Sequence, residues 1–265
     1  MRKKLLTALI ILLVIGGFLA IYIPQYQIDQ MFTYEIDKEK GEVTITGYLG
    51  DDNAREEYWR NERLGRENNV LVFPEKVEVP GKIKGYPVTA IGRRAFEWGK
   101  MKEVALPDTV VRLEYSAFAH CEDLEMLSGV ENVKVLEDYA LLDCKNLKQP
   151  DMPHLEEVSH ASFAGLHKWE TVIFPANIKV IPSWLCMDMD GLKTVNIPEG
   201  VEIIEGNAFG FCDSLQEIYI PPSVTEISRP NFAEIEDKVT ILGEKGSYAE
   251  EYATEVGISF REVSK

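Results

Sequence analysis

Apolar residues recur along most of this chain with a period of 22 or 23 residues. Each copy of the repeat contains an aromatic residue or a smaller apolar substitute, which we use as its marker. The seven markers are Phe96, Phe118, Leu141, Phe163, Cys186, Phe209 and Phe232. A fixed period of about 20 to 29 residues with apolar residues at constant offsets is typical of a solenoid, in which each turn buries its apolar side chains against its neighbours. The pattern therefore predicts a stack of turns over residues 88–242.

A short alternation of apolar and polar residues follows most markers and predicts one strand per turn. In the sixth copy Ile218 and Ile220 are the apolar positions, and Pro221 ends the pattern. Alternation with a period of two indicates a strand with one buried face, and proline cannot donate a hydrogen bond to a strand ladder. The second copy keeps only Leu127 of this pattern, and the third has Pro150 within it. We therefore expect copies two and three to be the irregular part of a mostly β solenoid.

The residues before the repeats follow a different pattern. Residues 31–36 and 42–48 alternate apolar with polar side chains, and they flank a polar connection that ends in Gly41. This arrangement predicts a β-hairpin. We expect the hairpin to cap the first turn, within an N-terminal unit of residues 31–87, because the end turn of a solenoid otherwise exposes its apolar face.

Residues 51–69 interrupt this N-terminal unit with a highly charged insert that contains Tyr58 and Trp59. One interpretation is a recognition element that presents the two aromatic side chains to a partner. The other is a solvated loop or short helix whose aromatic side chains pack on the cap. The composition of the insert is compatible with both.

Residues 243–265 predict a C-terminal cap. Four apolar residues from Ala249 onward fall on one face of a helix, Ser247 and Glu250 have the spacing of a capping box, and Gly257 predicts the end of the helix. A last short strand follows. This cap would cover the other end of the stack.

An uncharged apolar run of 19 residues occupies residues 5–23. A helix of this length, at about 1.5 Å per residue, can cross a hydrocarbon core of roughly 30 Å. Because the basic residues of this region all lie in residues 1–4, the positive-inside rule predicts a single-pass transmembrane signal-anchor. Residues 1–4 would then be cytoplasmic, and the solenoid would lie outside the plasma membrane and close to it. The alternative is a signal peptide, cleaved near Ala20, that releases a secreted chain.

The charge balance limits the possible partners. The chain carries 44 acidic and 28 basic residues, for a formal net charge of -16. Binding to nucleic acid requires clusters of lysine and arginine that neutralise phosphates. Nucleic acid is therefore not an expected partner.

The four cysteines follow the register of the repeat. Cys121, Cys144 and Cys212 each lie three residues after a marker, and Cys186 is itself a marker. This register predicts buried thiols in the core. A disulfide between Cys121 and Cys144, on adjacent turns, is the alternative.

The other residues capable of chemistry form no recognisable site. The four histidines, of which His160 and His167 belong to one copy, are expected on the surface rather than in a metal cluster. Residues 188–191 lack the third carboxylate and the closing glutamate of a calcium-binding loop. The sequence contains no catalytic-triad order, phosphate loop or dinucleotide fingerprint. It therefore predicts a non-enzymatic protein with no catalytic, metal or cofactor site.

Three segments of the sequence resemble a known family, the BspA-like leucine-rich repeat family of bacterial surface proteins. These segments are GYPVTAIG at residues 85–92, IGRRAF at 91–96 and EGNAFGFCDSLQEIYIPPSVTEI at 205–227. The resemblance covers about residues 80–242. It implies a right-handed, mostly β, extracellular solenoid that functions in adhesion or protein recognition and has no catalytic residues. The sequence departs from the family pattern at Ser159, Pro182 and Cys186, where we expect local irregularity.

Outward-facing residues of the predicted strands form two columns along the stack, and solenoids use extended surfaces of this kind for binding. Ile173 and Tyr219 are the expected apolar anchors, since a few large residues dominate interface energetics. The candidate binding residues are Glu103, Asp151, Thr171, Ile173, Thr194, Asn196, Glu217 and Tyr219.

These features favour a membrane-anchored extracellular module that binds a protein or glycan near the membrane, without a cofactor. An alternative is a structural or regulatory ectodomain that pairs with a neighbouring membrane protein through residues 5–23 and the insert. A further alternative is that the outward strand residues are simply solvated.

Overall fold

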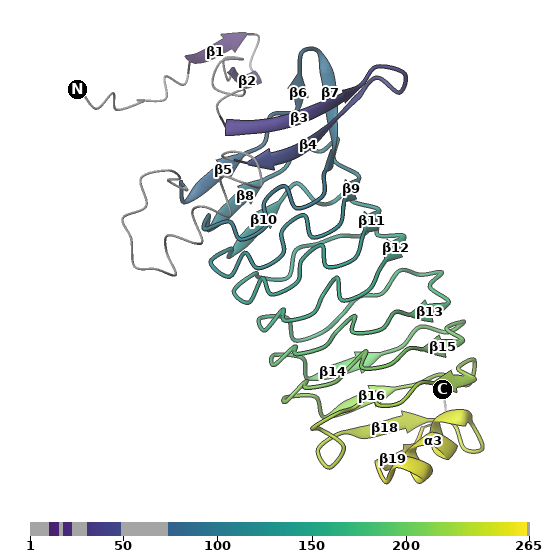
Figure 1. Cartoon of the computed structure of the whole chain (residues 1–265). Helices are drawn as coiled ribbons and strands as arrows, with labels where there is room; N and C mark the ends of the chain where they lie inside the picture. Colours follow the sequence, from purple (N-terminus) through teal and green to yellow (C-terminus); the bar gives the residue numbers. More distant parts are fainter. Residues whose placement is uncertain (1–10, 16–17, 23–30, 49–73, 264–265) are drawn as a thin grey trace.

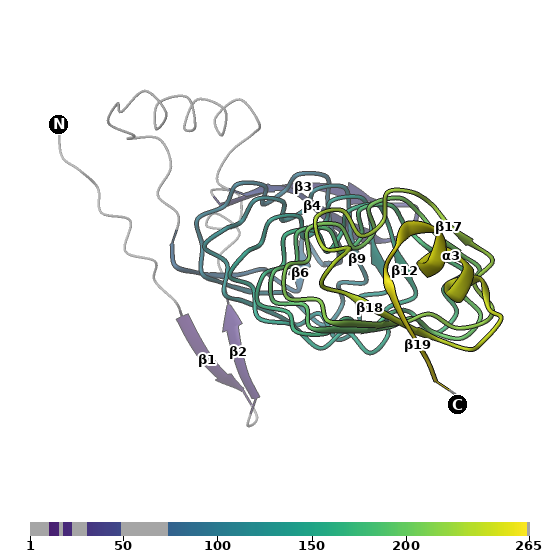
Figure 2. The same ribbon diagram turned by 90° about the horizontal axis from the view of Figure 1, so that it is seen from below.

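The computed structural model describes residues 11–15, 18–22, 31–48 and 74–263. Most of this part is a β solenoid of stacked turns that ends in one short helix, and Figure 1 shows the turns following one another from strands β3 and β4 to helix α3. Figure 2 looks along the stack, where the turns superpose as a flattened ring. We number the turns one to seven by their markers, from Phe96 to Phe232.

One face of the solenoid, called face A, consists of short parallel strands that follow the markers. These strands form two separate sheets. The first contains β5 (Lys76–Glu78), β8 (Glu103–Ala105) and β10 (Met126–Ser128). The second contains β14 (Thr194–Asn196), β16 (Glu217–Tyr219), β18 (Thr240–Gly243) and β19 (Ser259–Glu262).

Face A is interrupted at turns three and four, where residues 149–151 and 171–173 form no strand. Pro150 explains the first gap because it occupies the central strand position and has no N–H for the ladder. The expected irregularity of turn three is confirmed. That of turn two is wrong, because Met126–Ser128 pairs in register with Glu103–Ala105. Turn four forms no strand although its alternating pattern predicts one, and it lies beside the gap in turn three.

The second face, called face B, carries the strands that precede the markers, and it also consists of two sheets. The main strands of the first are β7 (Tyr86–Ile91), β9 (Arg112–Leu113), β11 (Val135–Leu136) and β12 (Glu157–Val158), and β6 (Lys82–Ile83) pairs with β7. The second sheet contains β13 (Val180–Ile181), β15 (Ile203–Ile204) and β17 (Glu226–Ile227). The break on face B therefore lies between β12 and β13, at the junction of turns four and five.

The third side, called the turn side, contains the markers and keeps continuous backbone hydrogen bonding. In turns one to six, the residues two before and two after the marker have positive φ, for example Tyr139 (61°) and Asp143 (55°) in turn three. Their N–H groups donate to the next turn, as from Tyr139 to the carbonyl of His160 (2.9 Å) and from Ala161 to that of Ser183 (3.2 Å). The turn side thus connects the turns at which both faces are interrupted.

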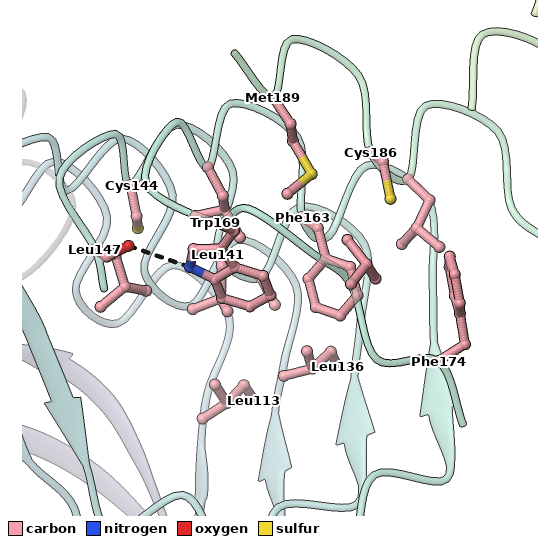
Figure 3. Close-up of a cluster of buried hydrophobic side chains, with 14 of the residues drawn as sticks. Leu113, Leu136, Leu141, Cys144, Leu147, Phe163, Trp169, Phe174, Cys186 and Met189 are labelled. Carbon is pink, nitrogen blue, oxygen red and sulfur yellow. Dashed lines mark hydrogen bonds between the residues drawn. The ribbon is translucent and has the colours of Figure 1, made fainter. Parts of the chain in front are cut away.

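The markers form one column in the core. The rings of Phe96 and Phe118 stack with centroids 4.8 Å apart. In turn five the marker is the small Cys186, but the preceding residue is Leu185, where most other turns have alanine. Leu185 and Cys186 are both fully buried, so the exchange of large and small side chains keeps the core filled. Figure 3 shows the middle of this core around Cys186.

A β-hairpin caps the N-terminal end of the solenoid, as the sequence predicts. Strand β3 (Phe32–Asp37) pairs antiparallel with β4 (Glu42–Tyr48), and β4 pairs parallel with β7 on face B. The ring of Tyr48 stacks on that of Phe96, with centroids 5.0 Å apart. The hairpin therefore extends both the sheet and the aromatic column.

Helix α3 (Tyr248–Val256) caps the C-terminal end, and Gly257 ends it with a φ of 77°. The ring of Tyr252 contacts that of Phe232 edge-on, with centroids 6.1 Å apart. The predicted capping box is not formed, because neither side chain bonds the backbone N–H that the motif requires. The side chain of Ser247 makes no capping hydrogen bond, whereas the carboxylate of Glu250 accepts a hydrogen bond from the N–H of Gly246 (2.6 Å).

The apolar N-terminal run is not helical where the structure describes it. Strands β1 (Ile11–Ile15) and β2 (Phe18–Tyr22) pair antiparallel, which corrects the helix predicted over residues 5–23. A uniformly apolar run has no period that separates helix from strand, and its isoleucine and valine residues favour strands. The part of the chain that the structure describes contains no helix that is long and apolar enough to cross a membrane.

Candidate functional site

Face A holds the candidate binding residues, which the structure divides into separate groups. Parallel pairing places Thr194 beside Glu217 and Asn196 beside Tyr219, so the candidates of turns five and six lie together. Glu103 lies on β8, in the other sheet. The remaining candidates lie in the interrupted segments of turns three and four: Asp151, Thr171 and Ile173.

Ile173 is the most exposed large apolar side chain in the described part of the chain. It is 72% exposed, whereas its neighbours Val172 and Phe174 are 8% exposed. The alternation therefore persists in turn four even though no strand forms there, and it directs the Ile173 side chain to solvent. Met126, on β10 of the first sheet, is the next most exposed at 46%. These two side chains provide the apolar area of face A.

Tyr219 is not an exposed anchor, so that prediction is wrong. Its side chain is 7% exposed, and its hydroxyl donates a hydrogen bond to Oε1 of Glu199 (3.1 Å). Burial, with a smaller contribution from Glu199, raises the pKa of Tyr219 to about 12. On the other side, Tyr219 lies beside Leu242 of β18. Neighbours on both sides therefore cover a residue that the strand pattern directs outward.

Glu217 is engaged in an ion pair that the sequence did not reveal. Arg261, on β19, places its guanidinium 2.6 Å from the carboxylate of Glu217. Both side chains are about half exposed, so the pair contributes little to stability. Arg261 extends the polar surface of face A to the last strand. The alternation in the last predicted strand could have indicated its outward direction.

A polar cluster on the turn side was also missed. Nδ1 of His120 lies 3.0 Å from Oδ2 of Asp143, and the hydrogen bond with His120 is the main cause of a lowered pKa of Asp143. His167 lies 3.6 Å from both Asp188 and Asp190. The signal in the sequence was the register, because His120 and Asp143 both stand two residues after a marker. Within the described ranges, no group of three or more histidine, cysteine or acidic residues could hold a metal ion.

All four cysteines are buried free thiols, so the alternative of a Cys121–Cys144 disulfide is wrong. The thiol of Cys144 donates to the carbonyl of Phe118 (3.1 Å), and that of Cys121 donates to the carbonyl of Phe96 (3.0 Å). Burial is the main cause of a raised pKa of Cys144. Such thiols are poor nucleophiles, which agrees with a purely structural role.

The charged insert at residues 51–69, with Tyr58 and Trp59, lies outside the described residues. Its role in recognition stays a prediction from the sequence. The same holds for the alternative of an ectodomain that pairs with a neighbouring membrane protein, because that alternative depends on the insert and on residues 5–23.

The stacked turns, their period and the marker column define a leucine-rich-repeat solenoid. A family model described as BspA type Leucine rich repeat region matches residues 83–189 and 145–253, in 6 copies. Together these matches span more than half of the chain. The chain therefore belongs to the BspA-type leucine-rich repeat family. Solenoids of this family are generally non-enzymatic interaction scaffolds and are typical of surface adhesion or protein-binding modules.

Solved structures include a similar solenoid, a leucine rich cell surface protein from Faecalibacterium prausnitzii A2-165. It aligns with a TM-score of 0.65 and 25% sequence identity, over 80% of this chain and 53% of that one. Our chain thus spans about half the length of that protein. The T. pallidum Leucine Rich Repeat protein aligns with a TM-score of 0.43 and 18% identity, over 87% of this chain and 95% of that one. No curated protein matches the sequence.

Proposed function

We propose that this chain is a non-enzymatic cell-surface recognition protein that binds a protein or glycan through face A. Membership of a family typical of adhesion and protein-binding modules supports this role. The observation that carries the proposal is the 72% exposure of Ile173 at the centre of face A, between two sheets whose outward residues are mostly polar.

The chemistry of face A suits a recognition surface. Ile173 and Met126 supply apolar area, while Thr194, Asn196 and Ser128 are exposed and supply hydrogen-bonding groups. Interfaces commonly combine an apolar centre with a polar rim. The parallel sheets hold the polar residues at fixed spacing along the stack, so that an extended ligand would meet several turns at once.

Attachment to the plasma membrane is part of the proposal, with the apolar run at residues 5–23 as the anchor and the solenoid outside the cell, although the described part of this run is a pair of strands and not the predicted spanning helix. The support comes from the sequence, in which these 19 residues are uncharged and follow a basic stretch. Protease treatment of intact cells tests the location. We expect solenoid peptides to be released from whole cells, and their appearance only after lysis would contradict an extracellular location.

Photo-crosslinking on intact cells tests face A. A benzophenone amino acid in place of Ile173 should form adducts with a ligand, because this side chain is expected at the centre of the interface. The same amino acid in place of Val111, which is 38% exposed near face B, is the matched control. Adducts from position 173 alone support the proposal. Equal adducts from both positions, or adducts from position 111 alone, contradict it.

A further inference from the structure

We propose that turn four is a hinge between two halves of the solenoid. The N-terminal half contains the described residues up to Val158, and the C-terminal half contains residues 180–263. Each half has its own sheet on face A and its own sheet on face B. This proposal depends on the hydrogen bonds between turns and does not require the proposed binding function.

The first observation is the loss of the ladder on face A. In regular turns the N–H of Leu106 donates to the carbonyl of Ser128 (2.8 Å), and that of Ile197 donates to the carbonyl of Tyr219 (3.0 Å). Within the described part of the chain, residues 149–151 and 171–174 make no backbone hydrogen bond to a neighbouring turn. Pro150 removes one donor from this ladder.

The second observation is the loss of the ladder on face B, where Pro182 removes one backbone donor. In regular turns the residue that follows the strand donates to the preceding turn, as from Glu137 to the carbonyl of Leu113 (3.0 Å) and from Glu205 to that of Ile181 (3.0 Å). Pro182 occupies this position in turn five and has no N–H. It cannot donate to Val158, and strands β12 and β13 do not pair.

A side-chain bond is lost at the same position. The carboxylates of Glu137 and Glu205 accept hydrogen bonds from the N–H groups of Tyr115 (3.0 Å) and Ser183 (2.8 Å) in the preceding turns. Turn five has Pro182 in place of this glutamate, and turn four has Ser159, which is too short to reach in the same way. The junction of turns four and five therefore lacks both the backbone bond and the carboxylate bond.

The turn side holds the two halves together. The N–H groups of turn four donate across the junction, as from Phe163 to the carbonyl of Leu185 (3.1 Å) and from Gly165 to that of Met187 (2.9 Å). Nδ1 of His160 also lies 2.7 Å from Oγ of Ser183. The turn side is thus fully bonded. Among the described residues, face B has no backbone bond across this junction, and face A keeps only the one from the N–H of Lys193 to the carbonyl of Glu170 (3.0 Å). This asymmetry defines a hinge axis along the turn side.

The core limits the opening of the hinge. Trp169 of turn four is buried, and its Nε1–H donates to the carbonyl of Leu147 in turn three (3.1 Å), as Figure 3 shows. Rotation about the turn side changes the angle between the two sheets of face A, and Ile173 lies at the joint. The hinge thus sets the relative orientation of the two halves of this surface.

Hydrogen exchange of the full-length protein, measured by mass spectrometry, tests the arrangement of bonds. We expect the amides of residues 171–174 and of Val180 to exchange at least about tenfold faster than their equivalents at 194–197 and Ile203. The turn-side amides at 161–165 should stay as slow as those at 184–188. Equal rates on the faces would overturn the hinge. Fast exchange on the turn side as well would also overturn it, because turn four would then be locally unfolded.

A repaired variant tests the motion itself. Pro150→Val with Pro182→Glu restores both missing donors and one carboxylate. Nitroxide labels are attached at Glu78→Cys and Thr194→Cys, about five turns or 24 Å apart along the stack. The distance between the two labels, measured by electron–electron resonance, reports the angle between the two halves. The native cysteines are buried, so the labels attach to the introduced thiols.

In the labelled protein that keeps both prolines, we expect a broad distribution of distances between the labels. In the labelled repaired variant we expect a distribution of about half that width. Pro222→Val, at an exposed proline outside the junction, is the control and should leave the distribution broad. A narrow distribution in the native protein overturns the hinge, as do equal widths in native and repaired proteins. The width of the distance distribution does not depend on whether face A binds a ligand, so this experiment tests the hinge alone.

Discussion

The carboxylate of Glu205 accepts a hydrogen bond of 2.8 Å from the backbone N–H of Ser183, one turn earlier in the chain. Glu137 and Glu114 make the equivalent bonds to the N–H groups of Tyr115 (3.0 Å) and Arg93 (3.1 Å). A glutamate four residues before the marker therefore ties its turn to the preceding one. Each bond satisfies an N–H that the strand ladder does not reach.

Glu205→Ala should lower the free energy of unfolding by about 1–3 kcal/mol, because it leaves the N–H of Ser183 without its partner. Urea unfolding followed by circular dichroism measures the loss. Glu226→Ala, at an exposed position of β17, is the matched control and should change stability by less than about 0.5 kcal/mol. Equal losses in the two variants would show that the bond across turns has no special role.

Asp143→Asn should reveal a contribution that depends on pH. The hydrogen bond with His120 lowers the pKa of Asp143 below its usual value of 3.8. A carboxyl group with a lower pKa in the folded chain stabilises the fold above its unfolded pKa, and this stabilisation is lost as the pH falls through the folded pKa. We expect the variant to be roughly 1 kcal/mol less stable at neutral pH, with a smaller difference at about pH 3.

Urea unfolding at both pH values measures this difference in free energy, and Asp151→Asn serves as the exposed control. A difference between Asp143→Asn and wild type that stays the same at low pH contradicts the prediction, because the lost contribution would then not depend on ionisation of the carboxyl group.

The thiols should react only after unfolding. The four cysteines are free and buried, and burial is the main cause of the rise in the pKa of Cys212 to about 12. A thiol reagent should give almost no signal with the native chain and four equivalents in guanidinium without reductant. A value of two equivalents would indicate a disulfide.

Trp169→Phe should destabilise the fold by about 1–3 kcal/mol, because the variant loses the hydrogen bond to the carbonyl of Leu147 in a buried site. Trp184→Phe makes the same change at a side chain that is 41% exposed, and it should cost less than about 0.5 kcal/mol. Denaturant unfolding followed by circular dichroism compares the two. A similar loss in both variants would argue against the importance of the buried bond.

The repeat period predicted most of the solenoid because the same apolar offsets recur in seven copies, so an unusual residue such as Cys186 does not shift the register. The interruption was harder to place. Pro182 follows the apolar Ile181 and leaves the hydrophobic pattern intact, and what it removes is a backbone donor. Hydrophobic periodicity does not record donors, so the sequence indicated irregularity near Ser159 and Pro182 without showing which strands separate.

Candidate site residues were predicted less well, because a strand pattern gives the direction of a side chain but not how far its neighbours cover it. Ile173 is exposed as expected. Tyr219 has the same outward direction, but Glu199, which lies 20 residues earlier, binds its hydroxyl. The N-terminal run shows a similar limit, since uniform hydrophobicity contains no information about helix or strand.

The turn-side ladder has a mechanical consequence. Its hydrogen bonds lie along the axis of the stack, so a pulling force along that axis stretches each bond in its own direction and separates turns one at a time. The junction of turns four and five keeps its turn-side bonds but, among the described residues, only one backbone bond on the two faces, from the N–H of Lys193 to the carbonyl of Glu170 (3.0 Å). It is therefore the point at which such a force would first part the chain. A solenoid held at one end and loaded at the other would therefore yield in the middle while both capped ends stay folded.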